Sequence, residues 1–207
     1  MANLQLKHAP ILNSSAQLLI LPVNTAGTLL DPILTRAKTL FPDNYQRYYR
    51  ACRDGSLSAG SCLLHKRTRE QAGLGISSNG NQPSYIANLV ISDHPYHPTR
   101  TRWLTDALID LHHQLIPLVR YHGIRRAALL ARPLIDNRLR SNISNSSNEP
   151  SSKNFSAGSL SLNEPNVANS LPLDWYLDIL PLLRQQLQDL PKLRIDVHVP
   201  KSIDIVS

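Results

Sequence analysis

Residues Pro22–Gly27 read PVNTAG, and this short stretch decides the fold because of what flanks it. Gln17–Val23 (QLLILPV), which leads into it, is a compact apolar run typical of a buried strand. Leu29–Leu40, which follows, carries apolar residues at helical spacing, and Pro32 is accepted there because it falls in the first turn. A strand that opens into a helix N-terminus presents free backbone N–H groups and the positive end of the helix dipole. Such a junction suits a phosphate or a ribose.

Asn24 is the residue of this junction whose side chain is best suited to bind a ligand. Its amide has both donors and an acceptor, so it is able to hold ribose hydroxyls. An asparagine at this place also fits a plain structural role, as the cap of the following helix. The residue alone does not separate these two readings.

The rest of the chain continues the alternation of strands and helices. Asp43 is predicted to cap a helix that ends near Gly55. Longer helices are predicted over Thr99–His122 and over Asp174–Leu190, the second of which Asp174 is expected to cap. Further strands are predicted at Leu4–His8, Ser61–Lys66, Tyr85–Ile91, Arg126–Ala131 and Leu193–Val199. Strands mixed with helices of this length predict an α/β sandwich with helices on both faces of a sheet.

The length of 207 residues fits one domain, residues 1–207, with one irregular segment. Between Ser141 and Ser170, Ser and Asn make up 17 of 30 residues. Such a composition cannot bury enough apolar surface to offset the chain entropy that folding costs. We therefore predict a disordered insertion at about 137–172, and a glycine- and asparagine-rich loop over Gly73–Gln82.

Composition excludes several classes of protein. With 42% hydrophobic residues and no apolar window long enough for a membrane span, we expect a globular protein without membrane contact. The N-terminal sequence has no basic region followed by an apolar run, so no secretory signal is expected. Cys52 and Cys62 are too few for a disulfide scaffold or a zinc site, and they fit a reduced, cytoplasmic protein. Cys52 is expected to pack against the core rather than to act as a nucleophile.

The charge balance favours an anionic partner. Lys and Arg number 22 against 15 Asp and Glu, which gives a net charge of +7. Nucleic acid or a phosphorylated ligand is the natural candidate for such a chain. Solubility alone accounts for the excess equally well.

Five segments, taken in order, resemble the macro domain family, and within it the DNA ADP-ribosyl glycohydrolase antitoxins of the DarG type. They are Pro22–Gly27, Leu40–Ser61 (LFPDNYQRYYRACRDGSLSAGS), Tyr85–Leu89 (YIANL), Arg120–Leu130 (RYHGIRRAALL) and Leu173–Leu187 (LDWYLDILPLLRQQL). The resemblance implies a macro-domain-like three-layer sandwich, in which a six-stranded mixed sheet lies between helices. It also implies a cleft for ADP-ribose at the carboxyl ends of the strands.

The family resemblance carries functional expectations as well. Some macro domains hydrolyse ADP-ribosyl links and others only bind them, so whether this chain is an ADP-ribosyl glycohydrolase stays open. In the antitoxin branch the reaction removes ADP-ribose from thymidine in single-stranded DNA. The implied partners are ADP-ribose or an ADP-ribosylated target, single-stranded DNA and a partner ADP-ribosyltransferase. No cofactor and no metal are expected.

Asn24 is the catalytic candidate that the resemblance supplies, because it would orient the distal ribose and an attacking water. The set of expected ligand-binding residues is Ile11, Asn24, Thr25, Gly27, Thr28, Ser92 and Arg132. Arg100 and Arg102 are expected to contact nucleic acid, whereas the nearby His94 and His97 are expected to be ordinary loop histidines.

Four elements depart from the family pattern, and together they predict a remodelled, degenerate cleft. Thr28–Pro32 replaces glycines that let the backbone approach the ligand, and Ser92 stands where the antitoxin branch has a lysine. The loop Ala131–Ile135 has no glycine, and Pro133 lacks an amide donor. At the N-terminus, Ala9-Pro10 replaces a Gly-Asx pair.

An arginine-rich rim could take over the role of the missing backbone amides, since guanidinium binds phosphate bidentately. Its members are Arg100, Arg102, Arg132, Arg138 and Arg140. A solvated basic face explains the same run equally well. The alternative function is therefore a catalytically dead macro-like module that binds a protein partner or single-stranded nucleic acid through its basic face. A cleft that accepts another nucleotide or a phosphorylated metabolite is a third reading.

Overall fold

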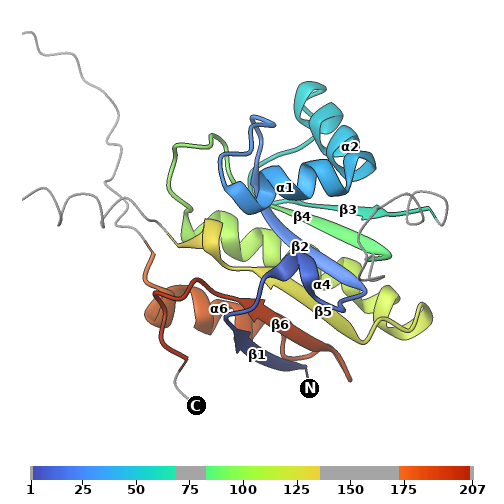
Figure 1. Ribbon diagram of the computed structural model, residues 1–207, viewed down its shortest axis with the longest axis vertical. Coiled ribbons are helices and arrows are strands. Elements are labelled where there is room, and N and C mark those ends of the chain that lie inside the picture. The colour runs from blue at the N-terminus through green and yellow to red at the C-terminus, as the bar shows by residue number, and fades with distance from the viewer. Residues whose placement is uncertain (1, 69–82, 136–172, 206–207) are drawn as a thin grey trace, which may run out of the picture.

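A six-stranded mixed sheet forms the centre of the computed structural model, which describes residues 2–68, 83–135 and 173–205 (Figure 1). The strand order is β1-β6-β5-β2-β4-β3, and every neighbouring pair is parallel except β3 with β4. The strands are β1 (Asn3–Lys7), β2 (Leu18–Asn24), β3 (Cys62–Lys66), β4 (Tyr85–Ser92), β5 (Arg126–Leu130) and β6 (Arg194–His198). The predicted mixed sheet is confirmed.

Helices cover both faces of this sheet. One face carries α1 (Pro32–Leu40), α2 (Pro42–Arg53) and the 3-10 turn η1 (Ile11–Asn13). The other carries α4 (Thr101–Tyr121), the π-helical turn η3 (Trp175–Ile179) and α6 (Leu180–Leu187). A second 3-10 turn, η2 (Arg132–Leu134), follows β5. The predicted three-layer α/β sandwich is therefore confirmed.

Strand β2 shows why a continuous apolar run is needed at the centre of the fold. All seven of its residues are buried. Leu18 and Ile20 join the core under α4 and α6, whereas Leu19 and Leu21 join the core under α1. Each fully buried leucine or isoleucine contributes about 1.5–3 kcal/mol relative to exposure, so both layers depend on this strand.

The capping residues explain why the observed helices begin at other residues than the predicted ones. Asp31 caps α1, since its Oδ1 accepts hydrogen bonds from the backbone N–H of Ile33 at 2.7 Å and of Leu34 at 3.4 Å. The helix consequently begins at Pro32 rather than at Leu29. Asp174 caps the last helical segment as expected, by accepting from the backbone N–H groups of Tyr176 and Leu177.

The prediction that Asp43 caps α2 is wrong. The helix starts at Pro42, and Phe41 occupies the cap position without a side-chain hydrogen bond. The Asp43 carboxylate turns instead to β3, where it lies 2.9 Å from Nε2 of His65 and 3.2 Å from Nε of Arg67. Burial alone raises the pKa of Asp43, but the hydrogen bonds from His65 and Arg67 outweigh it and hold the pKa below its usual value.

Because of this buried ion cluster, the free energy of unfolding should depend on pH. Because the folded pKa of Asp43 is depressed, its stabilisation is present above the unfolded pKa and is lost as pH falls through the folded pKa. We expect Asp43→Asn to lower the free energy of unfolding at neutral pH by about 1–3 kcal/mol, and this difference to shrink in acid. Urea denaturation at a series of pH values measures it. The exposed Asp106→Asn serves as control, and a difference that stays constant with pH would contradict the assignment.

No helix within the described ranges is both long enough and apolar enough to cross a membrane. The predicted insertion at 137–172 and the predicted loop Gly73–Gln82 lie outside the described residues. They remain predictions, as does the extent of the single domain.

Candidate functional site

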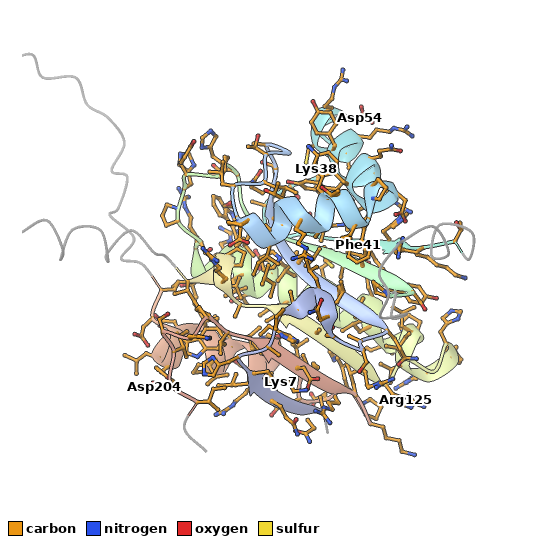
Figure 2. All side chains as sticks on the ribbon, viewed as in Figure 1. Lys7, Lys38, Phe41, Asp54, Arg125 and Asp204 are labelled. Atoms are coloured by element: carbon orange, nitrogen blue, oxygen red, sulfur yellow. The ribbon has the colours of Figure 1, made fainter. Side chains whose placement is uncertain are left out.

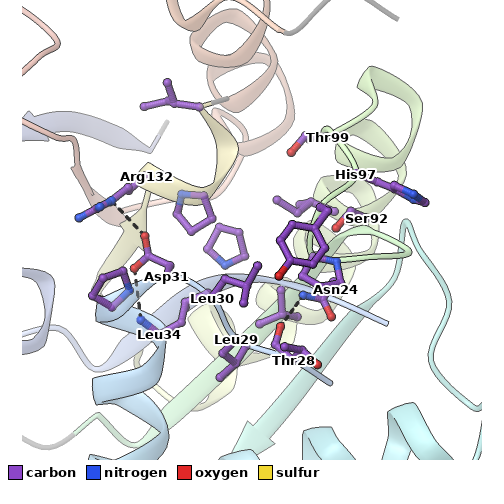
Figure 3. A pocket seen from close by; sticks show the side chains of 18 residues that line it. Asn24, Thr28, Leu29, Leu30, Asp31, Leu34, Ser92, His97, Thr99 and Arg132 are labelled. Carbon is purple, nitrogen blue, oxygen red and sulfur yellow. Dashed lines mark hydrogen bonds and ion pairs between the residues drawn. The ribbon is translucent and has the colours of Figure 1, made fainter. Parts of the chain in front are cut away.

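A cavity of about 460 Å³ opens at the carboxyl ends of the central strands β2 and β4 (Figure 3). This volume lies within the range of small-molecule sites in proteins. Three connections form its walls: β2 to α1, β4 to α4, and β5 to η2. The lining residues are Pro22, Val23, Asn24, Thr28, Leu29, Leu30, Asp31, Pro32, Leu34, Ile91, Ser92, Pro95, Tyr96, His97, Thr99, Arg132, Pro133 and Ile135.

Asn24 and Ser92 meet at the floor of the cavity because they are register partners. Strands β2 and β4 pair residue by residue up to Val23 and Val90, and then the register shifts so that Asn24 faces Ser92. A register shift of this kind re-aims the side chains at the end of a strand. Both residues are 6% exposed, so the floor is polar and almost dry.

Two residues, Thr28 and Tyr48, hold Asn24 in place through hydrogen bonds. Its Nδ2 donates to the backbone oxygen of Thr28 at 2.7 Å. The Tyr48 hydroxyl donates to the Asn24 backbone oxygen at 2.6 Å and lies 3.5 Å from its Oδ1. Burial raises the pKa of Tyr48, so this hydroxyl stays protonated and remains a donor. One amide N–H and lone-pair capacity on Oδ1 are left for a ligand.

The turn after Asn24 is held by its neighbours rather than by ligand-facing groups. Gly27 has a φ of 74°, and a Cβ there would lie 3.0 Å from a ring carbon of Tyr49, so only glycine fits. The Thr25 hydroxyl donates to the backbone oxygen of Asp93 at 2.8 Å, which ties this turn to the β4–α4 connection. Neither Thr25 nor Gly27 lines the cavity.

Asp31 and Arg132 form an ion pair across the opposite end of the cavity. Arg132 Nε lies 3.1 Å from Asp31 Oδ2, while the other carboxylate oxygen caps α1. Figure 3 shows the pair linking the wall from β2–α1 to the wall from β5–η2. Arg132, the predicted anion holder, is thus at the cavity but already has an anionic partner.

The fold and this geometry can be compared with known proteins. No protein-family model matches the sequence. The macrodomain of Thermus aquaticus DarG superposes with a TM-score of 0.66 at 21% identity, over 97% of this chain and 100% of that one. Thermosipho africanus DarTG in complex with ADP-ribose gives 0.65 at 20% identity, over 99% of this chain and 43% of that one. The macrodomain of Mycobacterium tuberculosis DarG gives 0.63 at 17% identity, over 97% and 100%.

This chain has the macrodomain fold. The predicted resemblance to the DarG type is also found in sequence, since a DNA ADP-ribosyl glycohydrolase of Thermus aquaticus is 31% identical over 101 residues. The match covers 49% of this chain, which spans about a quarter (25%) of the length of that relative.

The macrodomain cavity gathers four of the predicted ligand-binding residues, namely Asn24, Thr28, Ser92 and Arg132. Ile11 lies elsewhere: it is 1% exposed and packs in the core with Leu19 and Leu21. Its burial follows from η1, whose first residue turns inward below β2 and β5.

Arg100 and Arg102, predicted to contact nucleic acid, lie outside the cavity near the start of α4. The Arg100 guanidinium carbon lies 4.4 Å from the ring centroid of Trp103, and Arg102 is almost fully exposed, 3.8 Å from Asp106. His97, which was expected to be an ordinary loop histidine, does line the cavity, and its Nδ1 lies 2.7 Å from the Asp93 carboxylate.

Sequence reasoning missed Tyr48, which holds Asn24 from α2. The signal was available, because Tyr45, Tyr48 and Cys52 recur at helical spacing on the buried side of an otherwise charged helix. The prediction that Cys52 packs rather than attacks fits its surroundings: Sγ lies 3.8 Å from the Asn24 backbone oxygen, and burial raises the pKa of its thiol. In the described parts of the chain, no group of three or more His, Cys, Asp or Glu side chains is placed to hold a metal ion.

The ion pair at the cavity leads to a prediction on ligand charge. Asp31→Asn keeps a side chain that caps α1 well but removes the carboxylate charge that competes for Arg132. We expect the affinity of the cavity for a diphosphate ligand, with ADP-ribose as the probe, to rise about fivefold, since removing a partly screened charge near a diphosphate gains about 1 kcal/mol. Calorimetry with ADP-ribose measures the change. Uncharged ribose should show no gain, and a loss of ADP-ribose affinity would contradict the prediction.

Proposed function

We propose that this macrodomain binds the ADP-ribose group of ADP-ribosylated nucleic acid in the cavity and releases it by hydrolysis. The observation that carries the proposal is the buried Asn24 amide, fixed by Thr28 and Tyr48 at the floor of a cavity beside Ser92. Two similar proteins support it by name, a DNA ADP-ribosyl glycohydrolase and a DarTG solved in complex with ADP-ribose.

In the proposed reaction, the free N–H and Oδ1 of Asn24 hold hydroxyls of the distal ribose and orient a water molecule at its anomeric carbon. The bond between that carbon and the base breaks, the water oxygen bonds to the carbon, and the proton that the water loses is taken up by the leaving base. Holding ribose and water in one geometry is the main contribution available from a neutral amide.

The diphosphate would be held differently from what the family pattern implies. Pro133 provides no amide donor, and η2 replaces a glycine-rich loop. Arg132 is the cation that lines the cavity within the described ranges, and its guanidinium can grip phosphate oxygens once Asp31 gives way. The same replacement favours the second candidate, a module that has lost catalysis and binds only through its surface.

The substrate that we propose is single-stranded DNA, and the two free cysteines fit a reducing cytoplasmic setting for it. An ADP-ribosyltransferase that modifies the same DNA is the partner we propose. The net charge of +7 suits a polyanionic substrate.

The test has two arms. Calorimetric titration of the full chain with ADP-ribose should give saturable binding, and incubation with ADP-ribosylated single-stranded DNA should release free ADP-ribose. Binding without release would identify the catalytically dead module. Absence of heat at millimolar ligand would overturn the proposal as a whole.

A further inference from the structure

Helix α2 lies beside the point where a modified strand would leave the cavity. In the proposed function the distal ribose sits at Asn24 and carries the bond to the base, so the strand must pass close to the turn Thr25–Gly27. The Tyr49 ring packs directly on that turn, as the 3.0 Å approach of its ring carbon to a Cβ on Gly27 shows. The outer face of α2 therefore borders the exit.

This outer face is cationic, with three arginines and one exposed carboxylate, Asp54, at its C-terminal end. Arg47, Arg50 and Arg53 recur every three residues and are all exposed. Over the residues that the structure describes, none of the three forms an ion pair. Asp43, on the same helix, is buried with His65 and Arg67 and so does not neutralise them.

An exposed aromatic ring lies beside two of these cations, because Tyr49 lines the same surface hollow as Arg50 and Arg53. Tyr49 is 43% exposed, and its ring stacks on Tyr45 with centroids 5.8 Å apart and an interplanar angle of 24°. Lys38 Nζ lies 4.2 Å from the centroid of the Tyr45 ring, and the Tyr45 hydroxyl donates to the Gly27 oxygen at 3.3 Å. These contacts hold the Tyr49 ring in place before any partner arrives.

This surface hollow has a volume of about 450 Å³ and is lined by Gln46, Tyr49, Arg50, Arg53 and Asp54. Arg47 lies on the same helix but does not line it. Asp54, which is labelled in Figure 2, is the C-cap residue that follows Arg53 at the end of α2. Two guanidinium groups outnumber the one carboxylate in this hollow, so phosphates are expected beside Arg50 and Arg53. An aromatic ring flanked by guanidinium groups is the combination that binds unpaired bases with their phosphates.

We propose that the α2 face, defined by Arg47, Tyr49, Arg50 and Arg53, binds single-stranded nucleic acid next to the cavity. A base stacks on Tyr49 and the flanking phosphates contact Arg50 and Arg53. The partner is single-stranded, because stacking on an exposed ring needs a base that is free of its own duplex. The orientation of the strand rests on the proposed function, whereas binding by the α2 face does not.

The experiment measures fluorescence anisotropy of a labelled oligothymidylate of about 12 nucleotides, titrated with the full chain at several salt concentrations. Arg50→Ala/Arg53→Ala is compared with Arg120→Ala/Arg184→Ala, which removes the same charge from α4 and α6. We expect the first pair to weaken binding about tenfold or more at about 50 mM salt and to flatten the slope of log K against log salt by about 1.4. We expect Tyr49→Leu to weaken binding about fivefold or more without changing that slope.

Each contrary result is informative. Three results would overturn the proposal that the α2 face binds single-stranded nucleic acid. They are equal losses of affinity in both arginine pairs, losses confined to Arg100→Ala/Arg102→Ala, and no binding by the wild-type chain at low salt. ADP-ribose titrated into the Arg50→Ala/Arg53→Ala protein should bind as in wild type. Failure of ADP-ribose to bind wild type while DNA binds the α2 face would overturn the proposed function alone.

Discussion

Replacing Asn24 with alanine is expected to weaken ADP-ribose binding by about 30- to 150-fold, the largest effect at the cavity. The variant removes two hydrogen-bonding positions at a nearly dry floor, each contributing about 1–1.5 kcal/mol. It also removes the donor to the Thr28 oxygen, so the turn loses the bond that shapes that wall. Calorimetry measures the affinity, and a thermal melt of the unliganded variant measures the cost to folding.

The matched control is Asn3→Ala, an exposed asparagine on the edge strand β1, which should bind ADP-ribose as wild type does. Release of ADP-ribose from DNA should fall at least as far as binding in the Asn24 variant. An Asn24→Ala protein with wild-type affinity would show that the ligand lies elsewhere, whatever its melting temperature.

The second large effect is expected on the free energy of unfolding. It concerns Asn44 of α2 and Asn88 of β4, whose side-chain amides donate hydrogen bonds to each other in the core. Asn44 Nδ2 donates to Asn88 Oδ1 at 3.1 Å, and Asn88 Nδ2 donates to Asn44 Oδ1 at 2.8 Å and to the Leu63 oxygen at 3.3 Å. Both are buried, at 6% and 1% exposure. Asn88→Leu leaves the Asn44 amide without its partner, so we expect a loss of about 3–5 kcal/mol in urea denaturation.

The double variant Asn44→Leu/Asn88→Leu distinguishes the cost of leaving one amide without its partner from the cost of losing the hydrogen bonds between them. Replacing both amides by apolar side chains of similar shape leaves no stranded amide, so it should cost much less than the sum of the single variants. Additive losses would show that the two amides act independently. Because α2 also carries Tyr48, the stability of this pair bears on the position of Asn24.

The sheet and its helices could be predicted from the sequence because they depend on local pattern. Buried apolar runs such as those of β2 and β4 and the helical spacing of α4 are visible in any window of the chain. Asn24 and Ser92 were expected at one ligand site only because of the resemblance to the macro domain family. The register shift that pairs them at the ends of β2 and β4 is not visible in the sequence. Boundaries shifted by a few residues where a cap such as Asp31 decided the start.

The partners of charged side chains could not be predicted in the same way. Asp43 looks like a helix cap in sequence, yet it pairs with His65 and Arg67, which come more than twenty residues later. Arg132 looks like a free cation, yet Asp31 faces it across the cavity. Such pairings depend on long-range packing, which no local pattern records. The same holds for Ile11, whose burial depends on the strands above η1.

The Asp31 carboxylate divides its two oxygens between separate tasks. Oδ1 secures the first turn of α1, and Oδ2 occupies the guanidinium of Arg132. An incoming phosphate can therefore exchange with Oδ2 while the helix start keeps its hydrogen bonds. In the unliganded protein the Asp31 carboxylate thus stands in for the anion of a ligand. A ligand can bind or leave while the first turn of α1, which forms one wall of the cavity, stays folded.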